Sequence, residues 1–262
     1  MNLPREATFR ISIFAPLIIL VVYFLLLGLA QKPFFDSREF VKTLNSREIL
    51  FPLKLSLITA TTATLLATTI ALPAAYALSR FSFTGKYLID TFLDIPIVLS
   101  PVAMGTLILM GLHTEIGRSM ELRGVSISYS IGGVVVAQFT VIVAMSVRLL
   151  KAVFDEINPR FEQVARVLGC SAHGAFLRVS LPLAKKGILA SFVLAWARAI
   201  GEFGATVTVA GTIRGKTETI PTSIYLAMAG ADLNRVVILI TILVIISFGV
   251  LLLIRIIAGV KS

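Results

Sequence analysis

The sequence is a succession of apolar runs, each long enough to cross a lipid bilayer, separated by short polar connections. The first run, Ile11 to Ala30, has 20 residues and no charged side chain. A helix of that length spans the ~30 Å of a bilayer's hydrocarbon core. The chain is 57% hydrophobic and only 15% charged, whereas soluble domains are about 25% charged. These features predict an all-helical integral membrane protein.

Six transmembrane helices are expected in one transmembrane domain covering residues 1–262, at 11–30, 52–79, 91–112, 129–150, 183–210 and 236–258. A secretory signal is the rival interpretation of the first run, because Gly28-Leu29-Ala30 has small residues at cleavage-like spacing. Its apolar region exceeds the roughly 7–15 residues of a signal, which favours a span. A charged outer loop with a short surface helix is expected from Gln31 to Phe51, and a candidate re-entrant stretch from Ile220 to Met228.

The longest polar-rich insert, NPRFEQVARVLGCSAHGAFLRVSLP at 158–182, lies between the fourth and fifth spans. Asn158 is a good N-cap, and Gly169 can close the first helix in a left-handed turn. A second short helix is expected from Ala172 until Leu181-Pro182 breaks it. This predicts a helix–turn–helix across the membrane surface, either a solvated connector or a docking unit for a soluble partner. Apolar residues of the first helix form one stripe at i, i+3, i+4 and i+7: Phe161, Val164, Ala165 and Leu168.

The insert resembles the loop signature of ABC importer permeases, which reads EAA, three residues, Gly, nine residues, Ile, one residue and LP. Gln163-Val164-Ala165 stand at the EAA positions, and Gly169, Val179 and Leu181-Pro182 follow at the family spacings. The EAA triplet is degenerate here, and Val179 replaces Ile. The resemblance implies a cytoplasmic coupling loop that sits in a groove of an ATPase subunit. Its candidate residues are Phe161, Glu162, Gln163, Val164, Ala165, Gly169, Leu181 and Pro182.

The fifth predicted span contains ARAIGEFGATVTVA, in which Arg198 and Glu202 lie four residues apart and can pair on one helix face. An ionised side chain in mid-bilayer costs about 2.5–3.5 kcal/mol on insertion scales, so neither should face lipid. The pair is either a structural ion pair that holds helices together or part of a translocation path or gate. Prolines in the third span also predict a stretch that faces protein or water. The candidate path or gate residues are Arg198, Glu202, Phe203, Pro96 and Pro101.

A narrower resemblance covers roughly Thr59 to Ala258. GEFGAT, preceded by Ala197-Arg198 and followed by TETIPTSIY (217–225), closely resembles the permease subunits of molybdate and tungstate importers, and sulfate importers share much of the pattern. The resemblance implies a homodimer with two cytoplasmic ATP-binding subunits, which carry ATP and Mg, and an external oxyanion-binding protein. It also implies alternating access in a prokaryotic inner membrane.

Basic residues indicate the orientation. The net charge of +10 is scattered over the loops, as expected from topology and anionic lipid contact rather than from nucleic-acid binding. With both termini in the cytoplasm, the inner side has 13 Lys and Arg and the outer side 10. The region around the 158–182 loop supplies seven of the inner set and so favours cytoplasmic termini.

We expect no enzymatic activity and no cofactor in this chain. Residues 211–217, GTIRGKT, have three residues between the glycines where a phosphate-binding loop needs four. His113 and His173 lack partners at metal-ligand spacing. The alternatives to a molybdate or tungstate permease are a sulfate or thiosulfate ABC permease, or a self-contained secondary transporter. The latter class more often has additional intramembrane carboxylates.

Overall fold

The computed structural model describes residues 3–30, 32–34, 40, 44, 46–124 and 126–258. These residues form α1 (Leu3–Ala30), the 3-10 turn η1 (Lys32–Phe34), α3 (Arg47–Arg80), α4 (Lys86–Val98), α5 (Pro101–Leu112), α6 (Glu115–Leu122), α7 (Ile131–Glu156), α8 (Arg160–Val167), α9 (Ala172–Ala175), the π-helical segment η2 (Phe176–Ser180), α10 (Leu181–Ile200), α11 (Gly204–Ala210), α12 (Ile220–Ala229) and α13 (Leu233–Ala258). The prediction of an all-helical membrane protein is confirmed. Five described helices are long and apolar enough to span, or six if a bent pair counts as one span.

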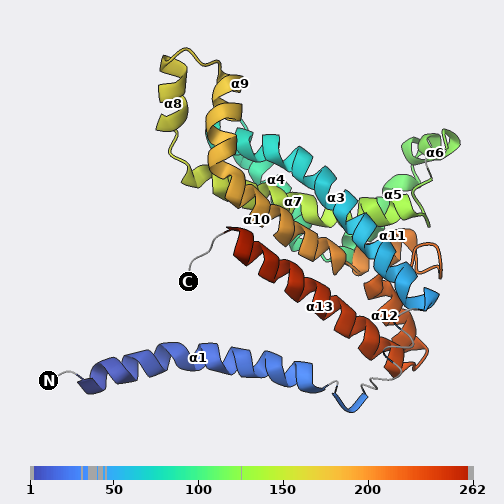
Figure 1. Cartoon of the computed structure of the whole chain (residues 1–262). Coiled ribbons are helices and arrows are strands. Elements are labelled where there is room, and N and C mark those ends of the chain that lie inside the picture. Colours follow the sequence, from blue (N-terminus) through green and yellow to red (C-terminus); the bar gives the residue numbers. More distant parts are fainter. Residues whose placement is uncertain are drawn as a thin grey trace.

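The central bundle is built on α3 and α7, which pack along each other, with α10 against both. Helix α13 packs beside α10 and α12, and α11 beside α5 and α7. Figure 1 shows α1 running beside this bundle without packing on it, and its membrane-length stretch has no buried side chain. The α8–α9 unit projects from one end of the bundle, the loop end, while α6 and α12 lie toward the opposite, far end.

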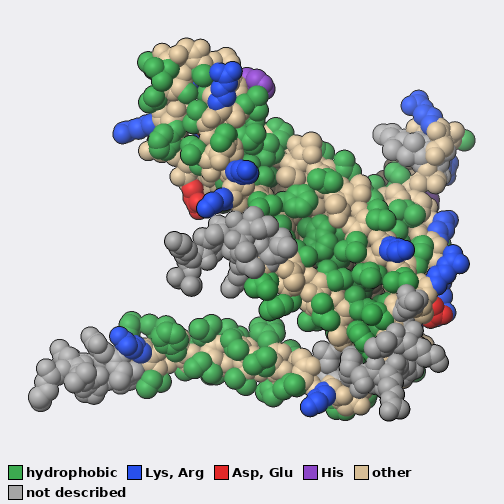
Figure 2. Space-filling view, in the orientation of Figure 1, with side chains coloured by type: hydrophobic (Ala, Val, Ile, Leu, Met, Phe, Trp, Pro, Cys, Tyr) green, Lys and Arg blue, Asp and Glu red, His purple; other side chains and the backbone are tan. Residues whose placement is uncertain are grey.

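Apolar and basic side chains occupy different parts of the surface. Figure 2 shows hydrophobic side chains covering most of the visible flank of the bundle, whereas Lys and Arg gather around the loop end and the far end. A bilayer satisfies this pattern, because its interior accommodates apolar side chains and its interfaces accommodate basic ones.

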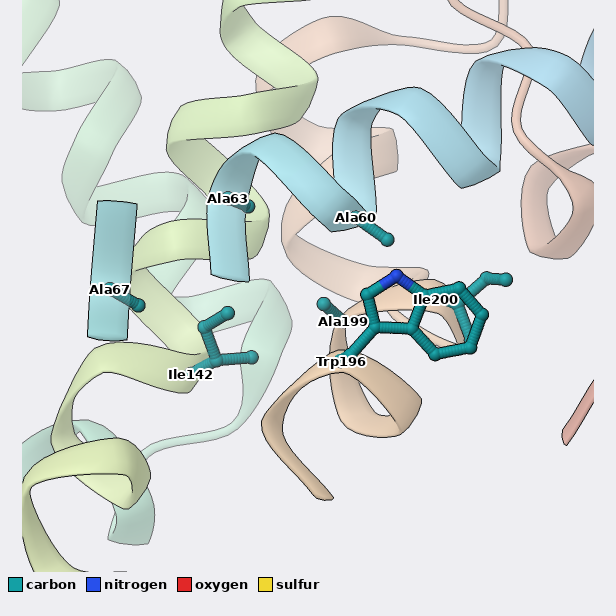
Figure 3. Close-up of a cluster of buried hydrophobic side chains, with 7 residues drawn as sticks. All are labelled: Ala60, Ala63, Ala67, Ile142, Trp196, Ala199 and Ile200. Atoms are coloured by element: carbon teal, nitrogen blue, oxygen red, sulfur yellow. The ribbon is translucent and has the colours of Figure 1, made fainter. Parts of the chain in front are cut away.

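Small residues allow the central helices to approach closely. Ala60, Ala63 and Ala67 of α3 are fully buried against α7 and α10, where Ile142 and Trp196 fill the space between the backbones (Figure 3). Without a hydrophobic driving force in lipid, close packing of small residues is a main source of helix association. The indole Nε1 of Trp196 donates to Thr61 Oγ1 at 3.0 Å, so the polar edge of the ring is also satisfied.

The predicted third span, 91–112, is not one helix. Helices α4 and α5 are bent by 109° at a break after Val98. Pro101 is the first residue of α5, and Ser100 before it is extended, with φ −63° and ψ 145°, as the residue before a proline prefers. The Ser100 side chain then accepts a hydrogen bond from the Ala103 amide at 3.2 Å and caps the new helix.

The predicted fifth span, 183–210, is also divided. Helix α10 ends at Ile200, and α11 begins at Gly204. Glu202 lies in this break, and its carboxylate accepts a hydrogen bond from the Ala205 amide at 2.9 Å. The carboxylate thereby satisfies one of the free amides in the first turn of α11, which stabilises the start of this helix.

The expectation that Leu181-Pro182 ends the second loop helix is wrong. The helix continues from Ala172 to Ile200, through the π-helical segment 176–180. The Leu181 amide bonds to the Phe176 carbonyl, five residues back. The wider π turn leaves room for the ring of Pro182, which would clash with a carbonyl in a regular α-helix.

The connection between the predicted fifth and sixth spans contains a short helix. Helix α12 occupies the stretch expected to be re-entrant and is too short to span. The short surface helix expected between Gln31 and Phe51 falls mostly outside the described residues.

Candidate functional site

The loop between α7 and α10 forms a helical hairpin. The Asn158 side chain accepts a hydrogen bond from the Arg160 amide at 3.0 Å and so caps α8, as its residue type predicts. Gly169 has φ +94°, and the following amide, of Cys170, bonds back to the Ala165 carbonyl at 3.0 Å. This is the left-handed helix ending expected at Gly169.

The apolar stripe of α8 is turned outward. Phe161 and Val164 are more than half exposed, while Val167 and Leu168 are 87% and 81% exposed. We call these four side chains the α8 patch. Single exposed apolar residues are ordinary, but four on one two-turn helix that projects beyond the spans form a surface suited to a protein partner. Gln163 and Pro182 are exposed as well, whereas Ala165 and Leu181 are partly buried.

The opposite face of α8 is tied to the end of α3. The Glu162 carboxylate accepts a hydrogen bond from Tyr76 Oη at 2.7 Å and from Arg80 Nε at 2.8 Å. A cavity of about 190 Å³ lies beside this contact, with Arg166 on its wall. Burial alone would raise the pKa of Glu162, but the hydrogen bonds and charge of its partners outweigh burial and hold that pKa below its ordinary value. Glu162 is therefore ionised at neutral pH.

Around this contact lies an aromatic cluster. The Tyr76 ring packs against Phe176 with centroids 4.5 Å apart, and against Phe154 at 5.4 Å. Phe154 is fully buried. The cluster thus joins α3, α7 and the π-helical segment at the loop end.

The second candidate group lies at the break between α10 and α11. Arg198 Nη1 lies 2.6 Å from Glu202 Oε2, so the two residues pair, as their spacing predicts. The Glu202 side chain is 1% exposed, whereas that of Arg198 is 38% exposed. Phe203 packs against Tyr225 of α12 with ring centroids 5.3 Å apart. The break therefore presents one guanidinium whose charge is partly compensated and partly accessible.

Both broken helices meet at the same place. A Cβ on Gly204 of α11 would lie 3.0 Å from the Pro101 and Val102 side chains of α5. A Cβ on Gly105 would lie 2.8 Å from Thr208 and 3.0 Å from the Ala205 backbone. This close crossing brings Pro101 beside the Glu202 region. Pro96 lies within α4, on the other side of the bend, and is partly buried.

Two polar groups were not anticipated from the sequence. In the first, Arg148 of α7 pairs with Asp94 at 2.6 Å and with Asp90 at 2.5 Å on α4. The predicted fourth span, 129–150, contains Arg148 near its end, and Asp90 lies directly before the predicted third span, 91–112. Their separation in the chain leaves no local signal of the pairing.

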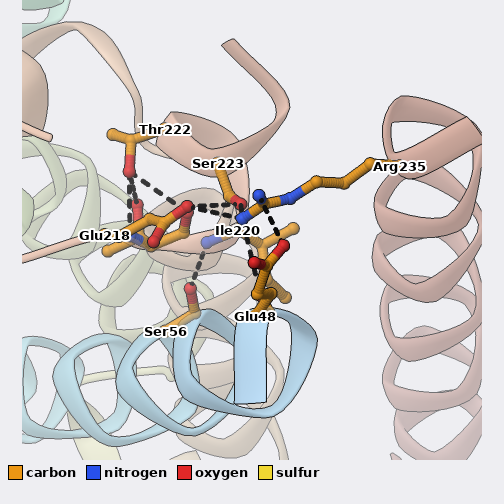
Figure 4. A network of polar contacts seen from close by, with 8 residues as sticks. Glu48, Ser56, Glu218, Ile220, Thr222, Ser223 and Arg235 are labelled. Carbon is orange, nitrogen blue, oxygen red and sulfur yellow. Dashed lines mark hydrogen bonds and ion pairs between the residues drawn. The ribbon is translucent and has the colours of Figure 1, made fainter. Parts of the chain in front are cut away.

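The second group is a polar network at the far end of the bundle that joins α3, α12 and α13 (Figure 4). Arg235 bonds to Glu218 at 2.9 Å and to Glu48 at 3.0 Å. Ser56 of α3 accepts a hydrogen bond from the Ile220 amide, at the start of α12, at 2.8 Å. The Glu218 and Arg235 side chains are buried, and they line a cavity of about 560 Å³ with Arg47 and Arg214. No described group of His, Cys, Asp and Glu could hold a metal ion.

Comparisons with known proteins agree on one family. The model of the family described as "Binding-protein-dependent transport system inner membrane component" matches residues 67–259. The probable transport system permease protein NifC of Clostridium pasteurianum is 32% identical over 95% of this chain and 89% of its own length. The molybdenum transport system permease protein ModB of Haemophilus influenzae is 38% identical over 66% of this chain and 77% of its own.

The sulfate transport system permease protein CysW of Synechocystis is 33% identical over 84% of this chain and 82% of its own length. Among solved structures, a bacterial ABC transporter involved in import of the acidic polysaccharide alginate has a chain with a TM-score of 0.76 at 15% identity, covering both chains entirely. At that identity the likeness concerns the fold alone.

Proposed function

The chain belongs to the family of inner-membrane components of binding-protein-dependent transport systems, and we propose that it carries molybdate or tungstate across the inner membrane. It is the permease subunit of an ABC importer in the molybdate and sulfate oxyanion group. Permeases of this family have no catalytic activity and need no cofactor of their own, because a separate subunit hydrolyses ATP.

The observation that carries the docking of an ATPase subunit is the α8 patch. Its four apolar side chains project beyond the spans at the loop end, where the described chain leaves each of them more than half exposed. A soluble ATPase subunit on each loop would bury them. The signature spacing around Gly169 and Leu181-Pro182 supports the same role. In this arrangement the loop end is cytoplasmic, and so are both termini.

The translocation path is proposed to run past the α10–α11 break. Arg198 there offers a partly exposed guanidinium that can attract an oxyanion, while Glu202 limits its charge and so the strength of binding. The break between α4 and α5 and the break between α10 and α11 provide hinges at which α5 and α11 can move together during alternating access. The chain is proposed to act as a homodimer with two ATP-binding subunits and an external oxyanion-binding protein.

The substrate is proposed from the sequence around this break. GEFGAT and TETIPTSIY resemble the molybdate and tungstate permeases, and the ModB similarity agrees with that assignment. Sulfate is the second candidate, because the CysW similarity extends over more of this chain.

The test is ATPase stimulation in proteoliposomes containing the permease, its ATPase subunit and its binding protein. Molybdate and tungstate should each stimulate ATP hydrolysis and accumulate in vesicles, with sulfate ineffective at the same concentration. Stimulation by sulfate alone would reassign the chain to the second candidate. Oxyanion uptake that continues without ATP or ATPase subunit would reject the proposal.

A further inference from the structure

Glu162 supplies the polar contact between α8 and the α3 helix. The α8 helix packs against α9 and the π-helical segment, which belong to the same loop. Its direct polar contact with the membrane body is the Glu162 carboxylate, held by Tyr76 and Arg80. Arg80 also donates to the Ile157 carbonyl at 2.8 Å, at the entrance to the loop.

The contact is largely shielded from solvent although it lies outside the spans. The Arg80 side chain is 8% exposed and that of Glu162 is 12% exposed. Exposed ion pairs contribute little to stability, because water screens them and both side chains lose entropy. A shielded pair with two donors on one carboxylate is different, since loss of either partner leaves a largely shielded charge with less compensation. The link is therefore stiff.

The helix attached to this link crosses the whole bundle. Helix α3 has 34 residues and is therefore about 50 Å long. At its far end Glu48 bonds to Arg235 of α13, and Ser56 bonds to the start of α12. Polar contacts thus join both ends of α3 to other parts of the chain: the Glu162 contact joins it to the loop, and the Ser56 hydrogen bond with the Glu48–Arg235 pair joins it to the far-end helices.

We propose that Glu162 is a positioning residue for energy coupling: it transmits displacement of the ATPase-docked loop to α3 and through α3 to the far end of the permease. The inference rests on the proposed function, because it requires an ATPase on the α8 patch. Glu162 itself faces away from that patch, since its carboxylate lies against α3. Its role is therefore separable from docking.

The second connection of the loop differs in kind. The α9 helix runs into α10 through the π-helical segment, where the Ser180 side chain is buried. Wide π turns inside helices are often functional. A stiff link to α3 and a continuous helix into α10 make one loop displacement act on two spans at once.

The experiment compares coupling ratios, the oxyanion imported per ATP hydrolysed, in the reconstituted complex of permease, ATPase subunit and binding protein. Glu162→Gln removes the charge and keeps the side-chain size. Glu156→Gln is the matched control, because Glu156 is an exposed carboxylate at the end of α7, close to the loop. Co-purification of the ATPase subunit and the thermal midpoint of the complex are measured alongside.

For Glu162→Gln we expect the ratio to fall roughly tenfold, because the Arg80 charge loses its charged partner. The ATPase subunit should still co-purify, and the thermal midpoint should fall only modestly, because the Gln oxygen can still accept hydrogen bonds from Tyr76 and Arg80. A purely structural role would lower the midpoint and the yield but leave the coupling ratio of the surviving complex unchanged. The charge-exchanged pair Arg80→Glu with Glu162→Arg should restore part of the ratio, and Glu156→Gln should leave it unchanged.

A wild-type ratio in intact Glu162→Gln complexes would overturn the inference. Should that variant fail to assemble, Tyr76→Phe replaces it, because this change removes one donor and keeps the ring in the aromatic cluster. It should lower the ratio, and a wild-type ratio would equally overturn the inference. Absence of oxyanion-stimulated ATPase activity in the wild-type complex would instead reject the proposed function, and the inference with it.

Discussion

Arg198 and Glu202 form an ion pair of 2.6 Å across one helical turn, and the other Glu202 oxygen caps the next helix at Ala205. One carboxylate therefore joins two functions, since it neutralises a guanidinium and starts α11. The break in the helix and the charge beside it depend on the same side chain.

Arg198→Ala should destabilise the protein more than Arg198→Ala combined with Glu202→Gln. The single change leaves a buried carboxylate without its partner, at a cost of up to about 3 kcal/mol. In the double variant the neutral Gln oxygen can still cap α11. Thermal midpoints in detergent measure the difference, and equal midpoints for the two variants would show that the pair contributes no stability.

Gly105→Ala should destabilise the crossing of α5 and α11. The added Cβ would lie 2.8 Å from the Thr208 Cβ and 3.0 Å from the Ala205 backbone, so the helices must separate, at a cost of about 1–3 kcal/mol. Gly111→Ala on the same helix is the control, because its Cβ would meet nothing within 4 Å. If both variants unfold at the same temperature, the crossing is not tightly packed.

Gly169→Val should weaken coupling by changing the angle between α8 and α9. Nothing crowds this position, but its φ of +94° is unfavourable for a side chain, and a left-handed backbone costs L-residues about 1–2 kcal/mol. Asn tolerates such conformations better than a β-branched residue. The coupling ratio should therefore fall in the order glycine, asparagine, valine, and identical ratios would exclude a role for the turn.

The contact between α8 and α3 should resist mild acid. Because the folded-state pKa of Glu162 is lowered, its stabilisation is complete above the ordinary carboxyl value of about 4.3. The stabilisation is lost only as pH falls through the lower folded value.

A spin label on Cys170, the chain's single cysteine in the loop turn, reports whether the contact between α8 and α3 is intact at a given pH. Its mobility should stay constant from pH 7 to about 5 and rise only below about 4. In the Glu162→Gln variant the label should be mobile at every pH. A transition near neutral pH in the wild type would contradict the assignment.

Local signals in the sequence predicted much of the loop. Periodicity identified the apolar face of α8, Asn158 marked its start, and the lone glycine at 169 predicted its left-handed ending. Pro182 was misleading, because the rule that proline ends a helix assumes a regular α-helical turn, and the turn here is π-helical.

Long-range features could not be predicted in this way. Arg148 bonds to carboxylates 54 and 58 residues earlier in the chain, and Arg235 bonds to Glu48, 187 residues away. Hydropathy places such charges in loops or near the ends of spans without pairing them, because it contains no information on which helices become neighbours.

Co-purification of the ATPase subunit with the tagged permease, followed by an ATPase assay with oxyanion-loaded binding protein, tests the central claim most directly. The wild type should retain an ATPase that the loaded binding protein stimulates. Val164→Asp, which places a charge in the α8 patch, should lose it, whereas Ile213→Asp, at an exposed apolar position in the connection between α11 and α12, should keep it. Retention of a stimulated ATPase by Val164→Asp, or transport by the permease alone, would contradict the account.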